Sequence, residues 1–153
     1  MLDLVRVVTE EEVRTVRCVL DHVPPAQPET VAQAEIQTIG GIQCRIEVAR
    51  VAAGRVGRAE WAGSDGQLIA DWTNRSMRYT DGASRSEEWS TPQSPTVLTT
   101  LREFVRALQQ KTPMPIAGED GCRAVEIAEA CYRSAEAGGK PVTLPLPASC
   151  RIG

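Results

Sequence analysis

Few residues of this sequence are of a type that commonly performs catalysis. The single histidine, His22, follows the first predicted strand and precedes Pro24-Pro25. A catalytic histidine needs a carboxylate or a nucleophile beside it, and the sequence assigns it neither. His22 is therefore predicted to lie at the edge of a loop. Glu87-Glu88, just before Trp89, could line a polar pocket, although such a pair more often marks the solvated end of a strand.

Motifs that bind nucleotides or activate a serine are missing from the sequence. There is no G-x-G-x-x-G and no P-loop. Gly63-Ser64-Asp65-Gly66 is rich in glycine, but it stands between two predicted strands, with no helix after it to receive a phosphate. Its serine is predicted to lie in a hairpin turn rather than in a nucleophile elbow. No catalytic and no cofactor-binding residue can be assigned.

The cysteines do not follow a metal-binding pattern. The chain has five of them: Cys18, Cys44, Cys122, Cys131 and Cys150. No two form a C-x-x-C pair, and zinc sites need closely spaced ligand pairs. Their odd number and wide spacing also disfavour a disulfide framework. We predict reduced thiols in a cytoplasmic protein, no metal site, and Cys44 and Cys131 as small core residues.

Length and composition describe an ordinary globular chain. Its 153 residues suit one domain, with 42% hydrophobic and 24% charged residues. The net charge is −3 and the sequence has no basic stripe that could bind phosphates, so we do not expect nucleic acid as a partner. No apolar run approaches the ~20 residues that cross a bilayer, and residues 1–9 do not have the pattern of a signal peptide. The three tryptophans lack surrounding Lys and Arg, which favours core or interface packing over base stacking.

Alternating residues and glycine turns predict strands over the first two thirds of the chain. Residues 2–8 are typical of the last turns of a helix and too few to form one alone. Turns follow about every ten residues, at 40–41, 53–54, 64–66 and 81–82. This spacing indicates an antiparallel meander. In the hairpins we expect Ile36 opposite Ile46, and Trp61 opposite Ala70.

The last third has the period of helices. Apolar residues recur from Val97 to Leu108, with Ser94 as expected N-cap and Pro113 ending the helix. Leu101 and Phe104 are expected to be buried, so their truncation to alanine should cost ~2–5 kcal/mol. A second helix is predicted over about 119–137, ended by Gly138-Gly139, and a short strand at 142–144.

These elements predict an α+β fold: an open, mainly antiparallel sheet with helices packed on one face. The helices should cover the apolar face that holds Ala59, Leu68 and Trp72, together with Trp61. The opposite face is mixed and polar. Its expected residues are Arg45, Glu47, Arg58, Glu60, Ile69 and Asp71.

The order of motifs resembles the C-terminal domain of the Gfo/Idh/MocA family, the relatives of glucose-fructose oxidoreductase and inositol dehydrogenase. Residues 101–108 are similar to the family's "F-v-x-A-I" helix, and residues 113–121 to its "P-x-x-x-G-E-D-G" motif. Residues 128–135 are similar to "x-E-A-x-x-x-S-A", and 59–66 to the "E-x-x-G-s-x-G" hairpin. Gly139-Lys140-Pro141-Val142 completes the pattern, so the resemblance extends over nearly the whole chain.

The resemblance implies the function of a larger protein. Such a protein is an NAD(P)-dependent dehydrogenase that acts on a sugar, polyol or related compound, and residues 1–153 would be its substrate and oligomerisation domain. Asp3-Leu4 matches the end of the family's "D-x-x-x-H-x-x-D-L" helix, so the catalytic histidine would precede Met1. The family's catalytic lysine and its NAD or NADP pocket belong to the nucleotide-binding domain, which this sequence lacks. We therefore expect no catalysis by the chain alone.

The resemblance also implies assembly, because open sheet faces pack together in the family's dimers and tetramers. We expect a homo-oligomer through the open sheet face, with a sugar or polyol as the substrate of the parent protein. Two explanations of the chain remain open within this resemblance. It is either a domain of a longer enzyme or a stand-alone dimerisation or ligand-binding module without enzymatic activity. A third reading is an α+β interaction domain that is unrelated to the family. A coding sequence for a G-x-G-x-x-G domain upstream of Met1 would favour the first.

Overall fold

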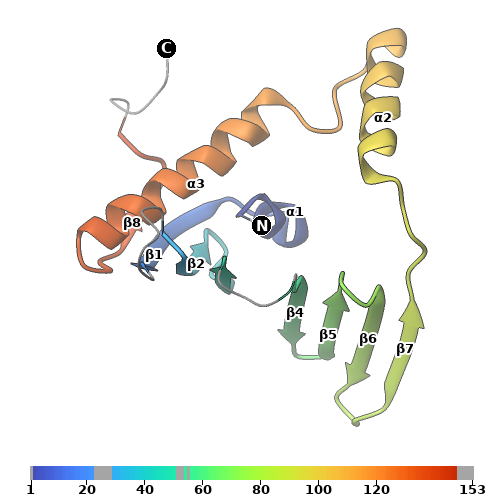
Figure 1. Cartoon of the computed structure of the whole chain (residues 1–153), viewed down its shortest axis with the longest axis horizontal. Helices are drawn as coiled ribbons and strands as arrows, with labels where there is room; N and C mark the ends of the chain where they lie inside the picture. The colour runs from blue at the N-terminus through green and yellow to red at the C-terminus, as the bar shows by residue number, and fades with distance from the viewer. Residues whose placement is uncertain (1, 23–28, 51–53, 55, 148–153) are drawn as a thin grey trace. The chain divides into compact units, whose positions relative to one another are not determined.

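The computed structural model describes residues 2–22, 29–50, 54 and 56–147, and it confirms the α+β class (Figure 1). The described residues form three helices and two antiparallel sheets of four strands each. The helices are α1 (Leu2–Thr9), α2 (Thr96–Gln110) and α3 (Gly118–Glu136). The strands are β1 (Val13–Asp21), β2 (Val31–Thr38), β3 (Gln43–Ala49), β4 (Arg58–Gly63), β5 (Gly66–Asp71), β6 (Ser76–Asp81), β7 (Ser86–Ser90) and β8 (Val142–Thr143).

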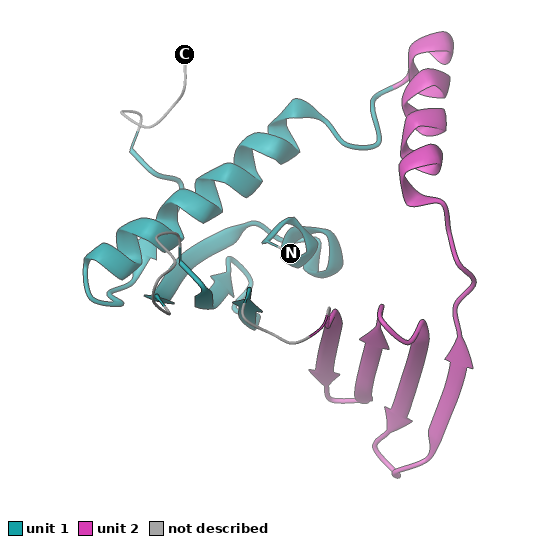
Figure 2. Cartoon of the chain, viewed as in Figure 1, with its two compact units in different colours: residues 1–51, 113–153 teal, residues 52–112 magenta. Residues whose placement is uncertain are grey.

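The chain divides into two compact units, coloured separately in Figure 2. Unit 1 combines both ends of the sequence, residues 1–51 and 113–153, and unit 2 comprises residues 52–112. The meander expected from the turns is therefore split into two sheets. Sequence periodicity could not show this division, because each hairpin has the same local pattern whichever sheet it joins. No helix of the described residues is long and apolar enough to cross a membrane.

Unit 1 is built on the sheet β3-β2-β1-β8, with α3 packed on β1 and α1 packed on α3. Its core lies between the sheet and α3, where alternate strand residues meet the apolar side of the helix. The most completely buried apolar residues there are Val16, Cys18, Ile36, Ile127 and Ala130. Cys131 is buried and Cys44 packs against the same core, as predicted. Among the described residues Cys18, Cys44, Cys122 and Cys131 form no disulfide, and Cys150 lies outside them.

The β2–β3 hairpin differs from its predicted register by two residues. Ile36 pairs with Cys44 and Ala34 pairs with Ile46. Two hydrogen bonds between Thr38 and Ile42 close the connecting loop around Gly41: the N–H of Thr38 donates to the carbonyl oxygen of Ile42 over 3.0 Å, and the N–H of Ile42 donates to Oγ1 of Thr38 over 2.9 Å. Gly41 has a φ of +97°, a conformation that favours glycine.

Unit 2 contains the meander β4-β5-β6-β7. Its first hairpin is also displaced by two residues from the prediction, so Trp61 pairs with Leu68 and Ala59 with Ala70. The turn is Ser64-Asp65, and it ends at Gly66, where a Cβ atom would collide with the carbonyl oxygen of Thr80. A shift by two residues preserves which side chains share a face. The predicted separation into an apolar and a polar face is therefore retained.

The expected burial of α2 is wrong for the described chain. The side chains of Leu101 and Phe104 are 56% and 49% exposed, and Trp72, on the sheet face that a helix was expected to cover, is 48% exposed. The period of apolar residues correctly predicted an amphipathic helix, but it does not say which surface the helix covers. The N-cap is Pro95 rather than Ser94, without a side-chain hydrogen bond.

Candidate functional site

The residues that the sequence offered for chemistry lie on separate elements. His22 is exposed just after β1, and Ser64 lies in the β4–β5 turn as predicted. Near His22, the carboxylate of Glu29 accepts a hydrogen bond from the Tyr132 hydroxyl over 3.0 Å and pairs with Arg50 at 3.5 Å. That hydrogen bond raises the pKa of Tyr132, which keeps the phenol a donor rather than a base.

Glu87 and Glu88 do not form a pair of acids. They are neighbours on β7, so their side chains point to opposite faces of the sheet. Glu88 pairs with Arg78 of β6 at 3.3 Å, and both side chains are more than half exposed. Such exposed pairs are solvated and contribute little to stability. The structure therefore gives the two carboxylates no shared catalytic role.

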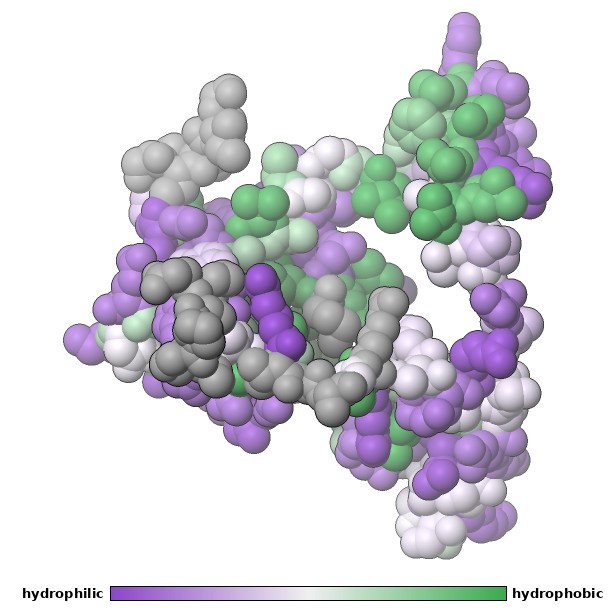
Figure 3. Space-filling view, viewed as in Figure 1, coloured by the Kyte–Doolittle hydropathy of each residue, from purple (hydrophilic) through white to green (hydrophobic). Residues whose placement is uncertain are grey.

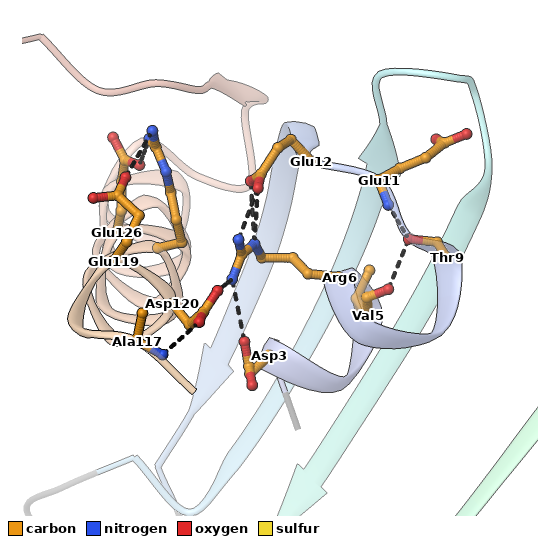
Figure 4. Close-up of polar contacts among 11 residues, drawn as sticks. Asp3, Val5, Arg6, Thr9, Glu11, Glu12, Ala117, Glu119, Asp120 and Glu126 are labelled. Atoms are coloured by element: carbon orange, nitrogen blue, oxygen red, sulfur yellow. Dashed lines mark hydrogen bonds and ion pairs between the residues drawn. The ribbon is translucent and has the colours of Figure 1, made fainter. Parts of the chain in front are cut away.

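A cluster that the sequence did not reveal surrounds Arg6 of α1 (Figure 4). The Arg6 side chain is only 13% exposed, and its guanidinium reaches carboxylates from three segments. It pairs with Glu12 at 2.7 Å, with Asp3 at 3.3 Å and with Asp120 of α3 at 3.4 Å. We call Arg6, Asp3, Glu12 and Asp120 the Arg6 cluster. It fixes α1 to the start of β1 and to the first turn of α3.

Asp120 serves this cluster and its own helix at once. One carboxylate oxygen accepts a hydrogen bond from the N–H of Ala117, at the N-cap of α3, over 2.8 Å. The other accepts from Arg6. The pKa of Asp120 is lowered, first by the backbone hydrogen bond from Ala117 and then by Arg6. The pKa of Glu12 is lowered chiefly by its hydrogen bond from Arg6.

The next turn of α3 extends the polar contacts. Arg123 pairs with Glu119 at 3.2 Å and with Glu126 at 3.0 Å. The other oxygen of Glu126 accepts a hydrogen bond from the N–H of Leu146 over 2.8 Å, which fastens the segment after β8 to the helix. Glu119 is the glutamate of the "G-E-D-G" motif, and Arg123 and Glu126 follow the motif within α3. Their arrangement assigns that motif a role in positioning α1, α3 and the chain beyond β8.

The second candidate surface is one face of the unit 2 sheet. Pairing across β4 to β7 brings together Trp61, Leu68, Tyr79 and Glu87 in one row, and Ala59, Ala70, Met77 and Trp89 in the next. We call the apolar members of these rows the aromatic face: Ala59, Trp61, Leu68, Ala70, Met77, Tyr79 and Trp89. Trp89 is 43% exposed, and the others are partly exposed. An exposed apolar surface of this kind is typical of a protein–protein interface.

The opposite face of the same sheet is polar. It carries Arg58, Glu60, Ile69 and Asp71, as predicted, with Arg58 paired to Glu60 at 3.2 Å. The predicted companions Arg45 and Glu47 lie on β3, in the sheet of unit 1. The six residues that were predicted to lie on one polar sheet face therefore belong to two different sheets.

Neither surface has the character of a closed small-molecule site. Within the described residues no group of three His, Cys, Asp or Glu side chains could hold a metal ion. A shallow hollow of about 540 Å³ runs along α2, between side chains such as Leu101, Val105 and Gln109. Because one helix supplies all of its walls, it cannot enclose a ligand.

Comparison with solved structures shows the fold. The chain is similar to UDP-N-acetylglucosamine 3-dehydrogenase from Acidithiobacillus ferrooxidans, with 20% identity, a TM-score of 0.82, and 91% of this chain matched to 45% of that one. It is also similar to an aldose-aldose oxidoreductase from Caulobacter crescentus in complex with glycerol. The identity is 21%, the TM-score is 0.81, and 94% of this chain matches 44% of that one. A third similar structure is an oxidoreductase from Agrobacterium radiobacter in complex with NAD+, L-tartaric acid and magnesium. Its sequence identity is 20% and its TM-score is 0.79, and 93% of this chain matches 46% of that one.

The chain therefore spans less than half the length of these solved relatives. No curated protein matches the sequence. Residues 2–144 match the family model described as the oxidoreductase family, C-terminal alpha/beta domain. This match extends from α1 through the "G-E-D-G" stretch to β8. The chain belongs to the Gfo/Idh/MocA oxidoreductase family, as its C-terminal domain.

Proposed function

We propose that residues 1–153 are the substrate-binding and oligomerisation domain of an NAD(P)-dependent oxidoreductase that acts on a sugar, a polyol or a related compound. The family match over residues 2–144 carries the proposal. The solved relatives support the substrate class, since one is an aldose-aldose oxidoreductase bound to glycerol and another acts on a nucleotide sugar. The NAD+ complex of a third supports the cofactor.

In this proposal the cofactor belongs to a second, nucleotide-binding domain of a cytoplasmic parent enzyme. Hydride transfer needs the nicotinamide held against the substrate, and the 153-residue chain contains no glycine fingerprint for a dinucleotide. Its own contribution is to fix α1 through the Arg6 cluster and to present surfaces for assembly. By itself the chain is not a catalyst.

Calorimetric titration of the chain with NADH and NADPH tests the division of roles. We expect no binding up to millimolar cofactor, and micromolar affinity would contradict the proposal. A longer form that adds a nucleotide-binding domain should reduce NAD+ or NADP+ in the presence of members of a sugar and polyol panel. A longer form that binds the cofactor but oxidises no sugar or polyol would contradict the substrate class.

We further propose that the chain forms a homo-oligomer through the polar face of the open sheet. Its charges alternate, so a two-fold contact can bring Arg58 of one copy against Glu60 or Asp71 of the other. Light scattering on the wild type and on Arg58→Glu tests this contact. We expect the variant to have a lower mass at the same concentration, and an unchanged mass would place the interface elsewhere.

A further inference from the structure

Helix α1 is too short to hold its own position. An isolated helix needs at least ~12 residues to be stable in water, and α1 has 8. Amphipathic helices such as α2, whose apolar side is visible in Figure 3, are usually positioned by burying that side. Helix α1 buries little: Val5 is its one buried side chain among the described residues, and Val7 is 65% exposed. Polar contacts must therefore supply much of what holds α1 in place.

The guanidinium of Arg6 supplies those contacts with a fixed geometry. Its Nε and Nη2 donate to the two carboxylate oxygens of Glu12 over 3.1 and 2.7 Å. Its Nη1 donates to Asp3 and to Asp120 over 3.3 and 3.4 Å. Because the guanidinium is planar and its donors form a rigid fork, these bonds set the direction of the side chain as well as its position (Figure 4).

The three carboxylates connect α1 to parts of unit 1 that are firmly placed. Glu12 immediately precedes β1, whose first residue, Val13, is 5% exposed. Asp120 also accepts a hydrogen bond from the N–H of Ala117, at the start of α3, over 2.8 Å. Asp3 of α1 and Asp120 of α3 lie within 3.4 Å of the same guanidinium nitrogen. Without that cation the two carboxylates would repel each other, so α1 would be pushed away from α3.

We propose that Arg6 is a positioning residue of the oxidoreductase, because the place of α1 sets how the substrate domain meets the nicotinamide. The inference rests on the proposed function, with the nucleotide-binding domain before Met1 as the family resemblance implies. Helix α1 is then the first element of this domain that the chain enters from the cofactor domain. Hydride transfer needs cofactor and substrate held together, and a misplacement of ~1 Å can lower a rate by ~100-fold. In this role Arg6 touches neither cofactor nor substrate and acts through the position of α1.

Hydrogen exchange on the 153-residue chain tests the anchor by itself. Arg6→Met removes the donors of the side chain and should speed exchange of the amides in the second half of α1 at least ten-fold. The amides of β2, within the core sheet, should keep their protection. Arg6→Lys keeps the charge without the fork and should have an intermediate effect. Arg85→Met is the matched control: Arg85 pairs with Asp81 at 2.8 Å within the β6–β7 turn, so its loss should leave α1 unchanged.

Kinetics of a longer form that adds the nucleotide-binding domain test the consequence for the reaction. Arg6→Met should lower kcat at least ten-fold, whereas the KM for the cofactor should stay within two-fold, because another domain binds it. With a substrate deuterated at the carbon that gives up the hydride, the isotope effect on kcat should increase in the variant, because misplacement slows the hydride step. A merely structural loss would reduce the active fraction and leave the isotope effect unchanged.

The outcomes separate the inference from the proposed function. A wild-type longer form that oxidises no sugar or polyol would contradict the proposed substrate class. An active wild type whose Arg6→Met variant keeps its kcat and isotope effect would contradict the inference alone, and so would unchanged exchange in α1. If circular dichroism shows that Arg6→Met does not fold, Arg6→Lys and Asp120→Asn decide instead, since the asparagine can still accept the N–H of Ala117. Wild-type kcat and wild-type exchange in both variants would overturn the inference.

Discussion

The backbone N–H of Cys18 donates a hydrogen bond to Oγ of Ser134 over 2.8 Å, joining the first strand of unit 1 to its last helix. The same hydroxyl donates to the carbonyl oxygen of Lys140 over 2.7 Å. Strand β8 pairs with β1 only at Thr15 and Val16, so Ser134 supplies the partner that β8 does not offer to Cys18. This bridge gives the serine of the "x-E-A-x-x-x-S-A" motif a structural role.

Ser134→Ala should lower the free energy of unfolding by ~1–3 kcal/mol, because the buried N–H of Cys18 loses its acceptor. Urea denaturation followed by circular dichroism measures the change. Ser94→Ala, at an exposed position, is the matched control and should change stability by less than ~0.5 kcal/mol. Equal effects of the two substitutions would contradict the role given to Ser134.

Ile127→Ala should destabilise unit 1 by ~2–5 kcal/mol, because Ile127 is 2% exposed and packs in the core between α3 and the sheet. Leu101→Ala should cost less than ~1 kcal/mol at concentrations where the chain is monomeric, since that side chain is already largely in water. Chemical denaturation of both variants decides the ranking. A larger loss at Leu101 than at Ile127 would mean that α2 is buried in the monomer.

The Arg6 cluster should make stability depend on pH below about 4.5, the ordinary pKa of a glutamate. Folding lowers the pKa of Glu12, so its stabilising contribution is complete above that pH and is lost as protonation begins below it. The Glu12 side chain is 49% exposed, and solvent screening should keep its contribution below ~1 kcal/mol.

Urea unfolding of the wild type and of Glu12→Gln between pH 3 and pH 7 measures this effect. The variant should be less stable at neutral pH, and the difference should shrink as the pH falls through 4.5 and below. Glu103→Gln is a suitable control, because Glu103 lies on α2, outside the cluster. A difference that stays constant over the whole range would exclude a contribution from the ionised Glu12.

Thiol reactivity should differ sharply between cysteines. Burial raises the pKa of Cys131 to about 12 and raises that of Cys18, whereas Cys122 is exposed. Because the thiolate is the nucleophile, iodoacetamide at pH 8 should label Cys122 in the folded chain and leave Cys18 and Cys131 unmodified. Peptide mass spectrometry before and after denaturation in guanidinium provides the readout. Fast labelling of Cys131 in the folded chain would contradict its burial.

Sequence patterns predicted the secondary structure better than they predicted contacts. The helix expected near 119–137 is observed at Gly118–Glu136, and the apolar and polar residues of the β4–β5 hairpin separate as predicted. Both hairpin registers were wrong by two residues. In the β2–β3 hairpin the hydrogen bond from Ile42 to Thr38 closes the loop in the observed register, and the alternation of the strands does not reveal that contact. A two-residue error leaves the faces unchanged, so the predicted faces survived it.

The candidate sites were harder to foresee, because their partners are distant in sequence. Arg6 and Asp120 are separated by 114 positions, and no periodic pattern links a short helix at the start of the chain to the first turn of the last one. Four residues of the aromatic face, Ala59, Trp61, Leu68 and Ala70, were predicted to share a face, whereas Met77, Tyr79 and Trp89 were not assigned to it. The expected cover of this face by a helix of the same chain is not observed among the described residues. Amphipathic patterns specify that a surface must be buried and leave the choice of partner to tertiary structure.

Unit 1 is assembled from both ends of the sequence, and this sets an order of events during synthesis. The hairpins of unit 2 join neighbouring residues, and such local pairings form quickly. Cys18 must instead wait for Ser134, 116 positions later, before the core of unit 1 can close. On the ribosome the strands β1 to β3 therefore emerge long before the helix that shields them. Until α3 has been synthesised, the apolar face of that first sheet has no helix of unit 1 to cover it.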